Sequence, residues 1–205
     1  MRFKTFALAT AVAVSALAAP AMAANFLTSG GTNQAVSNEN DFRDELAALP
    51  FNYTHQTISA SLSLDSAAYV TFELLGAESD LGDTFWVNGV EVKTENGESW
   101  GSVLIGSFWM NAGALDIKFT GGQDGAPGND RFALFTNGSG AINSQSIIFG
   151  YDDTIQLNDN HDDFIVRATI NAVPEASTWA MMIAGFAAVG MTVRRRSQSA
   201  RVSFS

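Results

Sequence analysis

Acidic and amide side chains crowd one short stretch near the carboxyl end of the chain, at Asp152, Asp153, Asp159, Asn160, Asp162 and Asp163. Calcium binds six to eight oxygen atoms, and carboxylates this close together repel one another unless a cation neutralises them. The stretch therefore predicts a calcium site in the loop 152–163. The alternative is a solvated loop, because Asp and Asn side chains also accept hydrogen bonds from nearby backbone N–H groups in turns.

A second candidate for the same cation is the glycine-rich stretch GGQDGAPGND at 121–130, which contains Asp124 and Asp130. Neither stretch has the ligand spacing of an EF-hand, and a single copy of this pattern is not a calcium-binding repeat array. A turn-forming loop is the alternative here as well.

A nucleophile motif occurs at residues 97–101, where GESWG matches the G-x-S-x-G pattern. Asp130 and His161 follow it in the chain order of α/β-hydrolases. The motif works only on a turn between a strand and a helix, whereas the sequence SVLIGSFWM after it is typical of a strand. We therefore predict no catalytic residues and no enzymatic activity, and a secreted hydrolase is the least favoured function.

Two tryptophans are candidates for stacking on sugar rings. Phe85 precedes Trp86, and Phe108 precedes Trp109. Neighbouring side chains on a strand point to opposite faces, so one of each pair should point into the core and the other outward. If Trp86 and Trp109 share an outer face, carbohydrate binding is favoured, and otherwise the aromatic side chains serve the core.

Short strands separated by turns must position all of these residues. Apolar residues alternate with hydroxyl residues over 57–64, and Asn88-Gly89 in TFWVNGVEVKT predicts a hairpin with a type I′ turn. Further strands are expected at 69–75, 102–110, 115–120, 132–136, 146–151 and 164–170. One short helix is expected at 41–49, with Asp41 as its cap. The fold class is therefore all-β, a single jelly-roll-like antiparallel β-sandwich over residues 24–171.

Charge is distributed unevenly along the 205 residues. The chain has 21 acidic and 11 basic residues, a net charge of −10, but residues 24–173 contain 20 acidic and only five basic side chains, a net charge of −15. Such a body repels phosphate backbones, so nucleic-acid binding is not expected and cations are the natural partners. The absence of cysteine excludes disulfides and zinc–thiolate sites.

The first 23 residues have the three parts of a secretory signal peptide. Arg2 and Lys4 precede an apolar run, and the small residues Ala21 and Ala23 end it. We therefore expect signal peptidase to cut between Ala23 and Ala24 and the chain to be exported across the inner membrane.

The carboxyl-terminal stretch, 172–205, differs from the body in composition. An apolar segment at 179–193 lies between Pro174-Glu175 and a basic end at 194–205. As a helix this segment is about 22 Å long, against a hydrocarbon core of about 30 Å. We predict a short transmembrane helix whose basic end stays in the cytoplasm and which holds the protein only temporarily. A permanent anchor is the alternative.

This tail resembles the PEP-CTERM sorting signal, in its PEPxxWA subgroup. The residues that carry the resemblance are Pro174, Glu175, Trp179, Ala180, Met181, Met182, Ile183, Gly185, Phe186, Arg194, Arg195 and Arg196. Ala176 stands where the pattern has a second proline. The resemblance implies that an exosortase, a membrane protease, recognises residues 174–178 and releases the protein from the membrane.

The same resemblance favours a structural or adhesive role in the bacterial envelope or biofilm, because sorting of this kind accompanies exopolysaccharide production. The alternative is a carbohydrate-binding surface module that depends on calcium. Both roles place the processed protein at the cell surface, in the outer envelope or in the extracellular matrix. The expected partners are signal peptidase, the exosortase, the membrane before processing, and exopolysaccharide.

Overall fold

The computed structural model describes residues 23–154, 160–171 and 176–199. Over these residues the chain forms, in order, β1 (Phe26–Ser29), β2 (Thr32–Ala35), α1 (Arg43–Ala48), β3 (His55–Ile58), β4 (Ser61–Leu64), β5 (Ala68–Val87), β6 (Val90–Met110), β7 (Gly113–Ala114), β8 (Ile117–Thr120), β9 (Phe132–Thr136), β10 (Ser146–Tyr151), β11 (Phe164–Ile170) and α2 (Ala176–Ser199).

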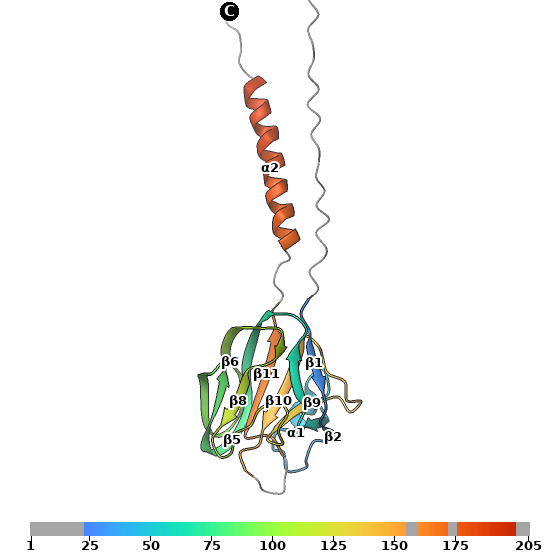
Figure 1. The fold of residues 1–205 in the computed structure, drawn as a ribbon, viewed down its shortest axis with the longest axis vertical. Helices are drawn as coiled ribbons and strands as arrows, with labels where there is room; N and C mark the ends of the chain where they lie inside the picture. The colour runs from blue at the N-terminus through green and yellow to red at the C-terminus, as the bar shows by residue number, and fades with distance from the viewer. Residues whose placement is uncertain (1–22, 155–159, 172–175, 200–205) are drawn as a thin grey trace, which may run out of the picture. The chain divides into compact units, whose positions relative to one another are not determined.

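The strands form two antiparallel sheets within one compact unit, Ala23–Val173 (Figure 1). The larger sheet has the order β2-β3-β9-β10-β11-β5-β6, with β8 paired to β5, and the smaller sheet has the order β1-β4-β7. Strands β9, β10 and β11 begin and end at the residues expected from sequence. The prediction of an all-β sandwich with one short helix in its body is confirmed.

Strands β5 and β6 form one long ribbon, which Figure 1 shows in green at the edge of the sandwich. Asn88 and Gly89 join them with φ angles of 51° and 73°, as the predicted type I′ turn requires. The sequence pattern predicted several shorter strands here, because Gly and Asp residues interrupt the apolar runs. Pairing nevertheless continues across them, with register shifts such as the one between Ser79 and Asp83.

The ribbon bends so that its second half faces its first half across the core. The first half of β5 pairs with β11, and the second half pairs with β8. Phe85 of the second half lies 5.4 Å from Phe72 of the first half, 6.0 Å from Phe149 and 6.2 Å from Phe164, measured between ring centroids. All four rings are buried, and they form the centre of the core.

A second, smaller core covers the outer face of the larger sheet near α1. Phe42 and Leu46 of the α1 segment pack there with Ile148 and Ile165. Gly76 of β5 permits this packing, since a Cβ atom on it would lie 2.7 Å from the Trp100 ring and 3.0 Å from the Phe42 ring. The α1 segment is thereby held close to the middle of β5.

Two local expectations were wrong. The alternating run 57–64 is two strands, β3 and β4, because Ser59 adopts a φ of 59° and turns the chain from one sheet to the other. The residue that caps α1 is Phe42 rather than Asp41. The Asp41 amide is engaged elsewhere, as a donor to Asp162.

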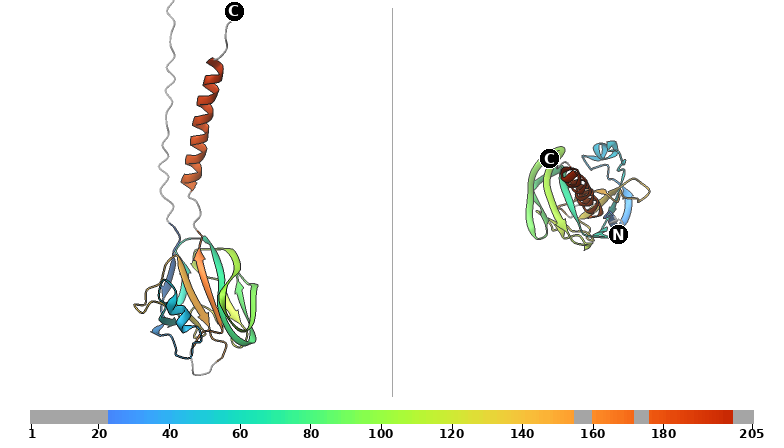
Figure 2. Two further views of the ribbon diagram at one scale, coloured as in Figure 1. Left: turned by 180° about the vertical axis from the view of Figure 1, so that it is seen from behind. Right: turned by 90° about the horizontal axis from the view of Figure 1, so that it is seen from above.

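Helix α2 lies in a separate unit of the chain (Figure 2). It contains the whole predicted helical segment 179–193. Among the residues that the structure describes, however, no helix meets the combined length and apolarity needed to cross a membrane. The predicted segment is therefore helical, and its role as a membrane span stays a prediction.

Candidate functional site

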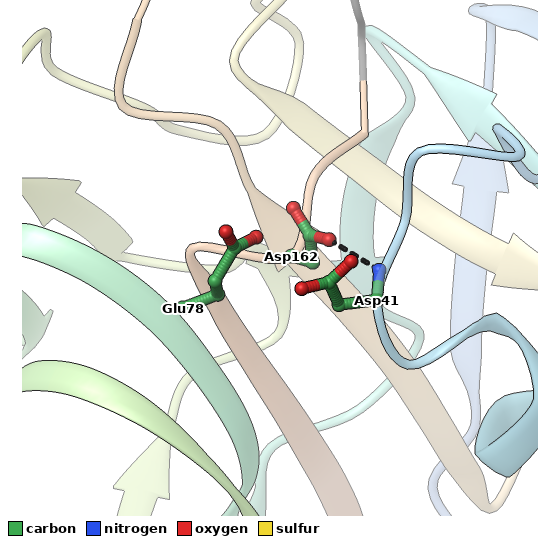
Figure 3. Close-up of side chains that lie close together, drawn as sticks. All are labelled: Asp41, Glu78 and Asp162. Carbon is green, nitrogen blue, oxygen red and sulfur yellow. Dashed lines mark hydrogen bonds between the residues drawn. The ribbon is translucent and has the colours of Figure 1, made fainter.

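Three carboxylates from distant parts of the chain meet at one end of the sandwich. Asp41 precedes α1, Glu78 lies in the middle of β5, and Asp162 precedes β11 (Figure 3). One oxygen from each lies within 4.8 Å of the others. We call Asp41, Glu78 and Asp162 the outer cluster, since Asp41 is exposed and Glu78 is half-buried.

Hydrogen bonds that involve backbone groups hold the three segments of the outer cluster together. The Asp41 amide donates to Oδ2 of Asp162 at 2.8 Å, and the Asn40 side-chain amide donates to the Asn160 carbonyl at 2.7 Å. The Glu78 amide points at the Asp163 carbonyl at 3.4 Å. These contacts bring together the three segments that carry the carboxylates.

Asp162 is the most unusual member of this cluster. Its side chain is fully buried, and its Oδ1 atom has no hydrogen-bond partner within the described part of the chain. Burial raises the pKa of Asp162 to about 7, and the charges of Glu78 and Asp41 add to the increase, while the hydrogen bond from Asp41 opposes it. A buried carboxylate oxygen without a donor is costly unless a proton or a cation meets it.

A second group, Asp83, Asp153 and Asp163, lies nearby, and we call it the inner cluster. Its carboxylate oxygens also lie within 4.8 Å of one another. Asp83 is fully buried and Asp153 nearly so, and Oδ2 of Asp163 accepts a hydrogen bond from the Asp153 amide at 2.7 Å. Burial and the neighbouring carboxylates raise the pKa of Asp163 to about 8.

The inner cluster is closely packed against the loop after β8. A Cβ atom on Gly121 would lie 1.7 Å from Oδ1 of Asp83, and one on Gly122 would lie 2.1 Å from the Asp153 carbonyl oxygen. Only glycine fits at these two positions without moving the carboxylates or the backbone.

The predicted loop 152–163 therefore contributes to both clusters instead of forming one site. Asp153 and Asp163 belong to the inner cluster and Asp162 to the outer one. Asp152 pairs with Arg131, with Oδ1 and Nη1 3.7 Å apart, and also accepts a hydrogen bond from the Thr154 amide. Asn160 contributes its backbone carbonyl to the contact with Asn40, and Asp159 lies outside the described residues.

Sequence reasoning missed Asp41, Glu78 and Asp83, which complete the two clusters. Asp41 was interpreted as a helix cap, and no local motif surrounds the other two. Glu78 and Asp83 flank the register shift in β5, and its only sign in the sequence is the stretch ESDLGD at 78–83, because Asp and Gly are uncommon within strands.

The second calcium candidate is a turn in this structure. The Asn129 side chain accepts hydrogen bonds from the Ala126 and Arg131 amides and donates to the Asp124 carbonyl. Asp124 and Asp130 are exposed and belong to neither carboxylate cluster of the described residues. The loop thus has turn-forming hydrogen bonds, and calcium binding by Asp124 and Asp130 stays a prediction.

The nucleophile-like motif lies inside a strand. Ser99 is part of β6 and pairs with Ala77 of β5, so it does not occupy a turn between a strand and a helix. The His161 ring contacts the Asp130 backbone carbonyl at 3.1 Å.

The two tryptophans point outward, but from opposite layers. Their neighbours Phe85 and Phe108 point inward as expected, and Phe85 belongs to the half of the ribbon that faces the first half across the core. Trp86 donates from its indole N–H to Thr120 at 2.8 Å and lies beneath the Lys118 ammonium group. Trp109 is 48% exposed and packs edge-on against Tyr69, which is 47% exposed. They do not form one stacking platform.

A cleft of about 540 Å³ lies beside α1, on the outer face of the larger sheet. Phe51 and Tyr53 line it with ring centroids 5.2 Å apart. Across from them Arg167 and Glu73 form an ion pair, with Nη1 and Oε2 3.5 Å apart. None of these four residues was singled out from sequence.

The residues of the predicted processing sites lie at the ends of the described chain. Ala23 is exposed and Ala24 is buried, with its carbonyl accepting a hydrogen bond from Gln145 at 2.7 Å, while Ala21 lies outside the described residues. Pro174 and Glu175 also lie outside them. The remaining motif positions, Trp179, Ala180, Arg194, Arg195 and Arg196, fall within α2.

A protein-family model matches the carboxyl-terminal part of the chain. The family described as the PEP-CTERM protein-sorting motif matches residues 172–196. Among curated proteins, none matches the chain. The match covers the stretch in which Pro174-Glu175, Trp179 and the three arginines were recognised, and it does not resolve the PEPxxWA subgroup. The chain therefore carries a PEP-CTERM sorting motif, which indicates an exported surface protein that an exosortase recognises.

Proposed function

We propose that this protein is a structural or adhesive component of the bacterial envelope or biofilm matrix, delivered by its carboxyl-terminal motif. The observation that carries the proposal is the division of the chain into a compact β-sandwich, Ala23–Val173, and a sorting motif at 172–196. A β-sandwich with its own core is a stable cargo that does not depend on the tail for folding. The tail then serves as an address that is read before the body reaches the surface.

The processing step can be tested in the native host by mass spectrometry of the protein isolated from the cell surface. We expect a mature chain that begins at Ala24 and ends close to Glu175, without Arg194 and the residues after it. A surface protein that still carries the three arginines would contradict exosortase processing. It would support a retained anchor instead.

Substitutions in the motif separate recognition from folding. Glu175→Gln should cause an unprocessed form to accumulate, because the resemblance places this residue in the recognised motif. Ser177→Ala, at a variable position of the same pattern, is the matched control and should be processed normally. Equal processing of both variants would show that the motif is not what the protease recognises.

The structural or adhesive role itself requires a separate measurement. We expect deletion of the protein to weaken biofilm cohesion or surface attachment without changing growth, and the processed protein to be recovered with the matrix fraction. Recovery only in the culture fluid, with unchanged attachment, would argue against this role.

The second candidate function is carbohydrate binding, which the cleft beside α1 favours. The half-buried Phe51 offers a stacking surface that the buried Tyr53 ring supports, and the Arg167–Glu73 pair offers charged hydrogen-bond partners for sugar hydroxyls. The exposed pair Tyr69 and Trp109 is a second stacking surface.

A glycan array probed with the protein, with and without calcium, tests this candidate. We expect Phe51→Ala to remove binding at the cleft, and Trp109→Ala to remove it if the exposed pair is the site. Trp86→Phe is the control, since Trp86 is engaged with Thr120 and Lys118. If no glycan binds with or without calcium, carbohydrate binding is wrong and the structural or adhesive role is the one proposal that remains.

A further inference from the structure

The outer cluster contains a buried polar atom that its surroundings do not satisfy. Asp162 is fully buried, its Oδ2 accepts a hydrogen bond from the Asp41 amide, and its Oδ1 has no hydrogen-bond partner among the described residues. Figure 3 shows the Asp162 carboxylate beside those of Glu78 and Asp41, with its hydrogen bond from the Asp41 amide. Leaving a buried carboxylate oxygen unmatched costs free energy, so the atom indicates a missing positive partner.

The donor set around this atom matches a hard divalent cation. Three carboxylates supply oxygen only, with no nitrogen or sulfur ligand, and calcium and magnesium are the ions that prefer such sets. One oxygen from each carboxylate lies within 4.8 Å of the other two, so one cation can contact all three. Calcium accepts several carboxylates in an irregular geometry, whereas magnesium demands a near-ideal octahedron and is usually bound through only one or two carboxylates. A set of three carboxylates therefore favours calcium.

The outer cluster is also accessible to an ion. Asp41 is exposed and Glu78 half-buried, so an ion can enter from solvent and retain water molecules that complete its coordination. The inner cluster is different, because Asp83 and Asp153 are buried and glycine residues pack directly against them. The two clusters thus have similar charge but unequal access.

We propose that Asp41, Glu78 and Asp162 bind one calcium ion, which ties together three segments that are far apart in sequence. The ion would join the loop before α1, the middle of β5 and the loop before β11. Because the α1 segment covers the second core, which includes Phe42 and Leu46, calcium stabilises the packing of that segment on the sheet. The inference does not depend on the role proposed for the protein at the surface.

Calorimetric titration of the full-length chain tests the proposal. The protein is purified in mild detergent, treated with EDTA, dialysed into about 0.15 M KCl to screen loose ion association, and titrated with calcium chloride alone. We expect one tight site, binding of magnesium at least ten-fold weaker, and a melting temperature about 5–10 °C higher with excess calcium.

Four variants locate the site. Glu78→Gln and Asp162→Asn should each weaken calcium binding at least ten-fold, and Glu78→Gln remains informative if Asp162→Asn fails to fold. Asp116→Asn removes an exposed carboxylate elsewhere, and Asp163→Asn removes one from the inner cluster, so both should retain the site. The proposal is overturned if the wild-type chain shows no saturable calcium binding. It is equally overturned if Glu78→Gln binds as the wild type does, or if only Asp163→Asn abolishes binding.

Discussion

The outer and inner clusters contain the neighbouring residues Asp162 and Asp163, yet they differ in solvent access and in the packing around their carboxylates. The outer cluster is held by hydrogen bonds between loops and opens to solvent through Asp41. The inner cluster is enclosed by the Gly121-Gly122 backbone. The density of acidic residues in a sequence therefore does not by itself define a cation site. Access and the surrounding packing decide whether such residues bind an ion or share protons.

The pH dependence of stability should show the largest effect. The pKa of Asp162 is raised to about 7 from the usual 3.8, so between these values the folded chain holds a proton that the unfolded chain has lost. Ionisation therefore destabilises the folded, metal-free protein as pH rises. The free energy of unfolding of Asp162→Asn, relative to that of the wild type, should therefore rise by on the order of 4 kcal/mol from pH 4 to pH 7. Urea unfolding in EDTA measures this difference.

Asp163→Asn should behave in the same way up to about pH 8, because the pKa of Asp163 is raised to about 8. Saturating calcium should reverse the trend for the wild type, since the ion favours the charged carboxylates of the outer cluster. Curves that run parallel for the wild type and both variants would mean that neither carboxylate titrates in this range.

Packing around the inner cluster predicts the next largest effect. Gly121→Ala should lower the free energy of unfolding by about 3 kcal/mol, because the new methyl group would occupy the position of Asp83 Oδ1. Chemical denaturation measures this loss. Gly185→Ala in α2 is the control, since its methyl group would meet no atom within 4 Å. A neutral Gly121→Ala would show that the inner cluster is loosely packed.

A smaller effect is expected where the α1 segment crosses β5. Gly76→Ala should cost about 1–2 kcal/mol, because the Trp100 and Phe42 rings must move aside. Since Phe42 follows Asp41, the same change should also weaken calcium binding several-fold, which titration calorimetry can measure. Unchanged calcium affinity despite lower stability would indicate that the outer cluster does not depend on this packing.

The smallest effect is expected at Asp65, an exposed carboxylate outside both clusters. Its side chain accepts hydrogen bonds from the Asn25 amide and side chain, which lower its pKa below 3.8. The stability that the Asp65 carboxylate contributes to the folded state is therefore present at neutral pH, and it is lost as pH falls through that lowered pKa. Asp65→Asn should reduce the melting temperature slightly at pH 7 and not at pH 2. If the variant lowered the melting temperature at pH 2 as much as at pH 7, the predicted direction of the pH dependence would be wrong.

Much of the fold was predictable because its signals are local. Alternating apolar residues and turn residues located β9, β10 and β11, and Asn88-Gly89 located the hairpin turn. The full length of β5 and β6 was not predictable, because their pairing passes through Gly and Asp residues that seldom occur in strands. Only the partner strand reveals that the ribbon continues.

The candidate site was predictable only in part. Asp153, Asp162 and Asp163 were identified from their density, but their partners Asp41, Glu78 and Asp83 lie at least 70 residues earlier in the chain. No short-range pattern connects residues at such separations. Asp152 resembled its neighbours in sequence and yet pairs with Arg131, a contact that depends on how two loops meet.

The sequence by itself determined where this protein is sent, because the sorting motif is a linear pattern recognised over residues 172–196. It also determined the all-β class, since strand alternation and turn residues act over a few positions. Only the tertiary structure decided which carboxylates meet, which of them are buried and which reach solvent. Those properties arise from the bend of the β5–β6 ribbon and the placement of the α1 segment, which bring distant residues within a few ångströms of one another.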